Sequence, residues 1–179
     1  MKVGSVTNSW IGGLSVLPIM LVLTVELAMA QGVGLSPVAP PWREELSPRR
    51  TEERIQVGSH EIDVELALTS EERRLGLGYR EGLAPESGML FINEPASPAS
   101  FWMKGMRFCL DIIWIEGGQI VGAAESVCPD PEGTADADRA TFLSPGPVQY
   151  ILEMPAGWLE DHDYGQGTPV EVSPRLDAL

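Results

Sequence analysis

Two apolar runs joined by a glycine pair constrain the fold of this chain more than any other feature. The runs are Phe108–Ile115 and Ile120–Val127, and the short segment Glu116–Gln119, with sequence EGGQ, separates them. Glycine reaches the positive φ angles of tight hairpin turns at little cost, and both runs are rich in residues that favour strands. We therefore predict an antiparallel hairpin within a β domain.

The two cysteines of the chain, Cys109 and Cys128, stand at the outer ends of this hairpin. A two-residue turn places Cys128 opposite Arg107, one diagonal step from Cys109, whereas a four-residue loop places the cysteines directly opposite each other. A disulfide is feasible in the second arrangement. Two small buried thiols are the alternative, and the sequence leaves both open.

The first thirty residues have the three parts of a secretory signal peptide. Lys2 supplies the positive charge, Ile11–Val25 the apolar core, and Ala28–Ala30 the small-x-small cleavage site. Glu26 ends the core before it reaches the about 20 residues of a membrane span. We predict cleavage after Ala30 and an exported, periplasmic or extracellular protein without a stable membrane span, with retention as an anchor as the alternative.

The rest of the chain divides into a leader, one domain and a short tail. Residues 31–53 are rich in proline and predict a disordered leader or linker. Residues 54–173 form the domain, and residues 174–179 are a C-terminal tail. Ile55–Val57 and Ile62–Leu68 predict paired strands, and Thr69 followed by Glu72 predicts the capped start of a short helix.

We expect a mainly β domain of seven or eight short strands and one or two short helices. We expect a proline-containing loop at Asn93–Ser100 and a long acidic loop at Cys128–Pro147, followed by a strand at Val148–Met154. These elements indicate a single compact β-sandwich or a distorted barrel.

The net charge of −14 argues against binding to nucleic acid or to anionic membranes, because both would repel the chain. The same charge is typical of a well-solvated acidic surface. The net charge therefore excludes two classes of partner but does not indicate which partner the chain has.

Five segments, taken together and in order, resemble domain-of-unknown-function family 192. They are VELALTSEERRLGLGYREGL (64–83), GMLF (88–91), FWMK (101–104), LDIIWI (110–115) and YILEMPAGW (150–158). The resemblance implies a jelly-roll type of β-sandwich and frequent export, and it implies no established activity.

The chain departs from the usual pattern of this family in three places. Gly78 stands where a methionine is expected, and Gly105-Met106 stands where Asn-Thr is expected after FWMK. The family often carries paired cysteines in the loop after the hairpin, where this chain has only Cys128. A polar site that used the Asn-Thr pair would be altered here.

Charged residues around the expected short helix and the neighbouring strands are the first candidate site. Arginine forks suit carboxylates and phosphates, so a pocket for an anionic ligand is one interpretation. The other interpretation is structural. In it, Glu72 caps the helix, and Arg80 or Lys104 forms an ion pair with Asp111 or Glu153. The candidate ligand-binding residues are Glu72, Arg73, Arg80, Trp102, Lys104, Asp111 and Glu153.

Strand alternation sends Trp102 and Lys104 to one face and Phe101 and Met103 to the other. Trp102 beside a lysine is a reasonable platform for a sugar or another ring, and it is also how a strand covers a core edge. We predict no metal site, because the two histidines lack ligand spacing, and we predict no cofactor.

We expect the chain to be a monomeric, non-enzymatic binding or accessory module of the cell envelope. A small anionic or carbohydrate-like ligand, or an envelope protein, is the expected partner. A hydrolase that acts on envelope material, with Glu72 or Asp111 as acid or base, is the first alternative. A structural partner of another envelope protein is the second.

Overall fold

A computed structural model of the chain describes residues 53–173 and 175–176. The predicted signal peptide at 1–30, residues 31–52 of the predicted leader, and residues 174 and 177–179 of the predicted tail lie outside the described residues. Within the described ranges, no helix is both long enough and apolar enough to cross a membrane.

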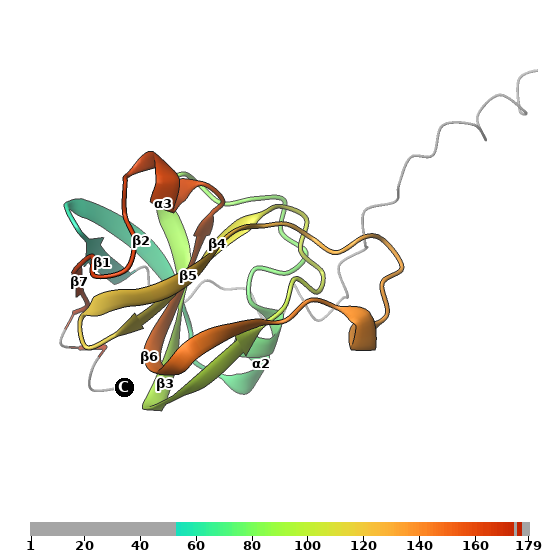
Figure 1. Cartoon of the computed structure of the whole chain (residues 1–179), viewed down its shortest axis with the longest axis horizontal. Helices are drawn as coiled ribbons and strands as arrows, with labels where there is room; N and C mark the ends of the chain where they lie inside the picture. Colours follow the sequence, from blue (N-terminus) through green and yellow to red (C-terminus); the bar gives the residue numbers. More distant parts are fainter. Residues whose placement is uncertain (1–52, 174, 177–179) are drawn as a thin grey trace, which may run out of the picture. The chain divides into compact units, whose positions relative to one another are not determined.

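The domain is mainly β, as predicted, and its seven strands form one sheet that curls into a half-barrel (Figure 1). The strand order is β5-β4-β6-β3-β2-β1-β7, and only the β2–β3 pair is parallel. The strands are β1 Glu53–Val57, β2 His60–Ala67, β3 Ser87–Phe101, β4 Leu110–Glu116, β5 Gln119–Val127, β6 Phe142–Pro155 and β7 Val170–Glu171. The helices are α2 Ser70–Leu75 and α3 Trp158–Asp161, with a 3-10 turn at Asp136–Asp138.

The two edge strands of the sheet, β5 and β7, meet at one end of the curl. The backbone N–H of Val170 donates to the Gly118 carbonyl at 2.9 Å, and that of Ile120 donates to the Thr168 carbonyl at 2.9 Å. The sheet therefore closes on itself at this end, which satisfies backbone groups that an open edge would expose.

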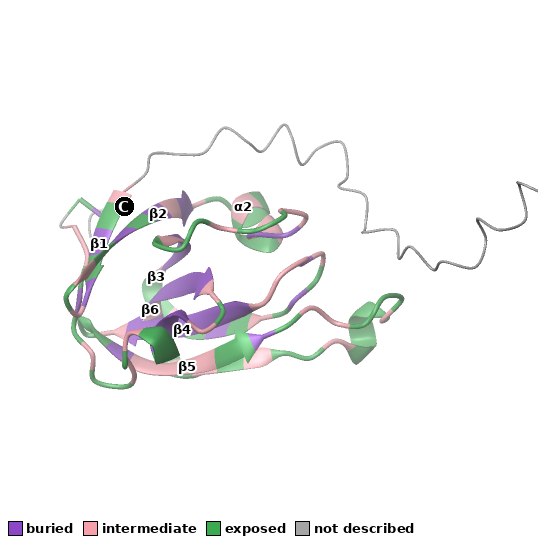
Figure 2. Cartoon of the chain, turned by 90° about the horizontal axis from the view of Figure 1, so that it is seen from above, coloured by how far each residue is buried: buried purple, intermediate pink, exposed green. Residues whose placement is uncertain are grey.

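Neighbouring residues on the central strands alternate between two apolar clusters, so these strands are buried on both faces (Figure 2). The first cluster contains Leu90, Ile113 and Leu152, and the second contains Phe91, Ile112 and Ile151. Leu77, Met103 and Met106, from the loops after α2 and β3, belong to the second cluster. The sheet thus has one core on each face.

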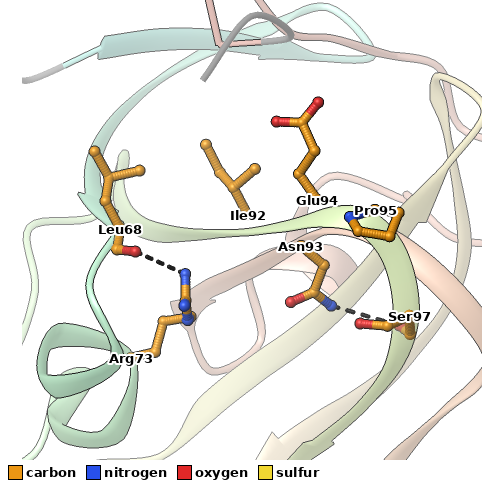
Figure 3. A pocket seen from close by; sticks show the side chains of 7 residues that line it. All are labelled: Leu68, Arg73, Ile92, Asn93, Glu94, Pro95 and Ser97. Carbon is orange, nitrogen blue, oxygen red and sulfur yellow. Dashed lines mark hydrogen bonds between the residues drawn. The ribbon is translucent and has the colours of Figure 1, made fainter.

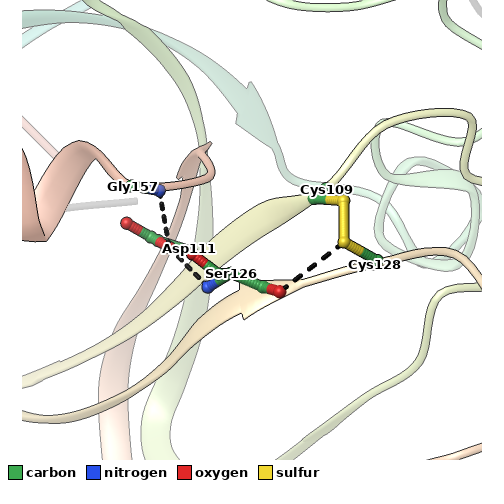
Figure 4. The surroundings of a disulfide bond; sticks show 5 residues. All are labelled: Cys109, Asp111, Ser126, Cys128 and Gly157. Carbon is green, nitrogen blue, oxygen red and sulfur yellow. Dashed lines mark hydrogen bonds between the residues drawn. A yellow bond between two sulfur atoms is a disulfide. The ribbon is translucent and has the colours of Figure 1, made fainter.

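The predicted hairpin is β4–β5, at one edge of the sheet, and the structure joins its two cysteines in a disulfide (Figure 4). Glu116 pairs with Gln119, so the turn is the two-residue glycine turn. Between Ile115 and Leu110, the β4–β5 pairing shifts register twice because β5 carries extra residues, and Leu110 is therefore paired with Val127. These bulges bring Cys128 opposite Cys109, an arrangement that we had linked only to a longer loop.

Two expected loops are partly strands. The segment Asn93–Ser100 lies within β3, and β6 begins at Phe142, inside the expected acidic loop. The pairing of β3 with β6 shifts register between Ile92 and Ser97 and again between Pro98 and Ser100. Prolines lack an N–H group and suit such irregular stretches, so these prolines interrupt the ladder without ending the strand.

Candidate functional site

Helix α2 begins with the capping box that the sequence predicts. The backbone N–H of Glu72 donates to the Thr69 hydroxyl at 3.1 Å, and the Glu72 carboxylate accepts from the N–H of Thr69 at 2.8 Å. The same carboxylate accepts from the Leu68 N–H at 3.0 Å. Glu72 therefore fixes the start of the helix and its exit from β2.

Arg73, the next residue of α2, lines three adjoining hollows, which we call together the Arg73 groove. The largest hollow, about 460 Å³, is lined by Leu68, Arg73, Ile92, Asn93, Glu94, Pro95 and Ser97 (Figure 3). The guanidinium donates to the Leu68 carbonyl at 2.7 Å. Among the described residues, no carboxylate forms an ion pair with Arg73. Its charge is therefore free to meet an anion in the groove.

The far side of the largest hollow is a polar stretch of β3. Asn93 donates through its side-chain amide to the carbonyl of Val148 at 3.2 Å and, more weakly, to that of Ser97 at 3.4 Å. Figure 3 shows Asn93 pointing to one side of β3 while Ile92 and Glu94 point to the other. The hollow thus lies between α2 and a strand that carries polar side chains.

Aromatic rings line the middle hollow, which measures about 220 Å³ and adjoins the first at Arg73 and Asn93. Phe91 and Phe101 pack edge to face with ring centroids 4.9 Å apart. Trp102 is 41% exposed, and the Lys104 ammonium lies 5.2 Å from its ring centroid. The predicted alternation is confirmed, because Met103 is buried while Trp102 and Lys104 are exposed.

Glu153 lies at the closed end of the groove, in the smallest hollow of about 30 Å³. Its side chain is 5% exposed, and its Oε2 atom has no hydrogen-bond partner among the described residues. Burial raises the pKa of Glu153 from its ordinary 4.5 to about 8, against the opposing charge of Arg80. The carboxyl is therefore neutral over most of the physiological range.

Space beside Glu153 depends on Gly76, which ends α2 with a φ of 51°. A β-carbon at this position would lie 3.7 Å from Glu153 Oε2 and 3.5 Å from the Phe91 ring. Any larger side chain would fill the hollow and would also be strained at this φ. The glycine thus leaves the buried carboxyl at the wall of the smallest hollow.

Arg80 and Lys104 form ion pairs, but not with the partners considered from the sequence. Arg80 donates two hydrogen bonds to Glu65, at 2.6 and 2.8 Å, and both side chains are 19% exposed. Lys104 pairs with Asp136 of the acidic loop. Arg80 ties the loop after α2 to β2, so its role is structural. Lys104 stays at the rim of the groove.

Asp111 lies on the opposite face of the sheet from Glu153. Asp111 is opposite Met154 and Glu153 is opposite Ile112 in the β4–β6 pair, and cross-strand neighbours share a face. The Asp111 carboxylate is fully buried and accepts from three backbone N–H groups (Figure 4). The carboxylates of Asp111 and Glu72 therefore bind backbone groups away from the groove. This argues against the catalytic acid or base role that is the alternative interpretation of these two residues.

Several groove residues were not singled out from the sequence. Phe91 and Gly76 belong to segments that carried only the family resemblance, at 88–91 and 64–83, and Asn93 belongs to an expected loop. The available signal was a polar residue directly after the buried run Met89–Ile92, which marks a point where a strand leaves the core. The β6 residues that line the two smaller hollows, Ile151 and Glu153, are distant in sequence from Asn93, so no local pattern could reveal the groove.

The two histidines, which are far apart in the sequence, lie side by side outside the groove. The ring centroids of His60 and His162 are 4.2 Å apart, and His60 Nδ1 lies 2.8 Å from the Tyr164 hydroxyl. His162 Nε2 is 3.7 Å from a Glu86 oxygen. Within residues 53–173 and 175–176, no three His, Cys, Asp or Glu side chains are grouped so that they could hold a metal ion.

Comparison with known proteins agrees with the resemblance seen in the sequence. The family model of DUF192, described as Uncharacterized ACR, matches residues 53–172. No curated protein matches the chain.

Two solved structures are similar. A protein of unknown function from Novosphingobium aromaticivorans is 29% identical, with a TM-score of 0.60, over 66% of this chain and 84% of that one. A protein from Sinorhizobium meliloti, described as a putative transcription regulator, is 31% identical, with a TM-score of 0.63, over 70% of this chain and 96% of that one.

Proposed function

The chain belongs to the DUF192 family of uncharacterised proteins, and we propose that it is a binding module whose Arg73 groove holds a small organic anion. One observation carries this proposal. Arg73 lines all three hollows, and among the described residues its guanidinium has only a backbone carbonyl as partner. An arginine fork of this kind suits a carboxylate.

The size and lining of the groove support a small ligand with an apolar part. The largest hollow, at about 460 Å³, falls within the range of about 300–1,000 Å³ that is usual for ligand pockets. Phe101 and Trp102 line the middle hollow beside Arg73 and offer aromatic surface to the rest of the ligand. The anion would thus meet the guanidinium while its apolar part lies on the rings.

A non-enzymatic role is part of the proposal. Hydrolysis by acid and base needs two ionisable groups that converge on one substrate. Glu72 caps α2 and Asp111 binds backbone N–H groups on the other face, so neither faces the groove. A role as a structural partner is less favoured, because the large apolar side chains exposed among the described residues are Trp102 and Leu143, which is a small surface.

We propose a location in the cell envelope on the strength of the sequence at residues 1–30. A role in transcription, which the description of the Sinorhizobium meliloti protein suggests for that protein, is not proposed here. The net charge of −14 would repel nucleic acid.

Thermal unfolding of the full chain with added small molecules tests the proposal. The panel contains small carboxylates, neutral sugars, nucleotides, calcium and copper, because a ligand that binds only the folded state raises Tm. We expect a carboxylate to raise the Tm of the wild type and of Arg54→Ala, but not that of Arg73→Ala. Arg54 is a matched control because it is an exposed arginine on β1 that pairs with Asp63, outside the groove.

Equal shifts for the wild type and Arg73→Ala would remove the groove as the binding site. No shift with any member of the panel would overturn the proposal and favour a protein partner.

A further inference from the structure

The closed end of the Arg73 groove contains a buried polar group that nothing in the fold uses. Glu153 is only 5% exposed, and within the part of the chain that the structure describes its Oε2 atom has no hydrogen-bond partner. Buried polar side chains are nearly always hydrogen-bonded, because leaving one unpaired is costly. The exception at Glu153 therefore needs an explanation.

The fold offers partners to the other buried acid but not to this one. Asp111 accepts hydrogen bonds from the backbone N–H groups of Ser126 and Leu159 at 2.7 and 3.0 Å. Arg80, whose charge acts on Glu153, donates two side-chain hydrogen bonds to Glu65. Glu153 is thus placed to pair with something that enters the groove.

We infer that Glu153 is a specificity-determining residue that hydrogen-bonds a hydroxyl group of the ligand, so that the groove takes a hydroxylated carboxylate such as a sugar acid. This inference rests on the proposed function, because Arg73 must hold the carboxylate of the same molecule. Arg73, Trp102 and Glu153 all line the smallest hollow, so one small molecule can meet all three.

The volume beside Glu153 suits a single functional group. The hollow measures about 30 Å³, and a cavity needs about 10–15 Å³ to hold one water molecule. A hydroxyl oxygen is about as large as a water oxygen, so a hydroxyl can enter where a ring or a carboxylate cannot. The ring of a sugar acid would stay in the wider middle hollow, against Trp102.

The charges around the hollow favour a neutral group at Glu153. Arg73, Arg74 and Lys104 line the same hollow, and they would repel an ammonium group. A neutral carboxyl can donate one hydrogen bond and accept another, which matches a hydroxyl group. The raised pKa of Glu153, about 8, agrees with a neutral carboxyl.

Three ligands of similar ring size separate the two parts of this inference. D-glucuronate carries a carboxylate and hydroxyl groups, cyclohexanecarboxylate carries only the carboxylate, and D-glucose carries only hydroxyl groups. Isothermal titration of the full chain should show the tightest binding for glucuronate. We expect cyclohexanecarboxylate to bind about tenfold more weakly, which is the usual worth of one hydrogen bond to a buried group.

Variants assign each effect to a residue. Glu153→Met keeps the volume but removes the hydrogen bond, so it should weaken glucuronate binding about tenfold and leave cyclohexanecarboxylate unchanged. Glu153→Gln can still donate and accept, so it should bind glucuronate nearly as the wild type does. Arg73→Ala should weaken the binding of glucuronate and of cyclohexanecarboxylate by the same factor.

The results distinguish failure of the inference from failure of the proposed function. Equal wild-type affinities for glucuronate and cyclohexanecarboxylate, both dependent on Arg73, would overturn the role of Glu153 and leave the anion site intact. Absence of binding by either carboxylate would overturn both. The comparison of ligands on the wild type decides the matter even if Glu153→Met does not fold.

Discussion

The Asp111 carboxylate of β4 accepts a hydrogen bond of 3.0 Å from the backbone N–H of Leu159 in α3, which lies 48 residues further along the chain. The same carboxylate accepts from Ser126 at 2.7 Å and from Gly157 at 3.2 Å. Ser126 occupies a bulge of β5 with a φ of 50°. One buried side chain therefore holds together the hairpin bulge and the start of the last helix.

Asp111→Ala should lower the free energy of unfolding by about 3–4 kcal/mol, because three backbone N–H donors, of which Leu159 is buried, lose the buried carboxylate that accepts from them. Chemical denaturation measures this loss. The control is Asp138→Ala, which removes an exposed aspartate from the acidic loop and should change stability little. Similar losses for the two variants would contradict the structural role of Asp111.

Arg80→Ala should lower the free energy of unfolding by about 1–3 kcal/mol, because a half-buried, two-pronged pair with Glu65 is broken. Lys104→Ala should have a much smaller effect, since Lys104 and Asp136 are 40% and 56% exposed and water screens them. Denaturation of both variants beside Arg80→Lys, which keeps the charge but not the fork, checks this ranking. Equal losses at Arg80 and Lys104 would contradict it.

Removal of the disulfide by Cys109→Ala with Cys128→Ala should lower the free energy of unfolding by about 3 kcal/mol. The bond closes a loop with a sequence separation of 19, and a loop of this length gives about that stabilisation. A reducing agent should destabilise the wild type to the same extent and leave the double variant unchanged. Two free thiols in unfolded, unreduced wild type would show that the bond is absent.

The stability of the wild type should fall relative to Glu153→Gln as pH rises from about 5 to 8. The pKa of Glu153 is raised from 4.5 to about 8 by burial, so the folded state holds a proton that the unfolded state releases. This contribution is complete below the unfolded pKa of 4.5 and is lost as pH rises through the folded pKa.

Within that window, the difference in the free energy of unfolding between the two proteins should change by about 1 kcal/mol per pH unit, as measured by chemical denaturation at each pH. Glu160→Gln, which changes an exposed glutamate of α3, serves as the control and should follow the wild type. A difference between the wild type and Glu153→Gln that does not vary with pH would show that Glu153 is ionised in the folded protein.

Local patterns were sufficient for the features that neighbouring residues determine. The glycine pair predicted the hairpin between β4 and β5, although not the length of its turn, and Thr69 with Glu72 determined the start of α2. Period-two alternation predicted that Trp102 and Lys104 share one face and Met103 lies on the other, and in the structure Met103 is buried while Trp102 and Lys104 are exposed. The mainly β class followed from these elements, because each depends on contacts only a few residues apart.

Tertiary structure alone decided which candidate residues share a site. Asp111 and Glu153 lie on adjacent strands, yet the β4–β6 register places their carboxyl groups on opposite faces of the sheet. Two bulges in β5 align Cys109 with Cys128, and an insertion of this kind leaves no clear mark in the sequence. Strand register depends on packing between distant segments. For this reason, the sequence determined the elements of the fold, while the pairing of its strands determined the site.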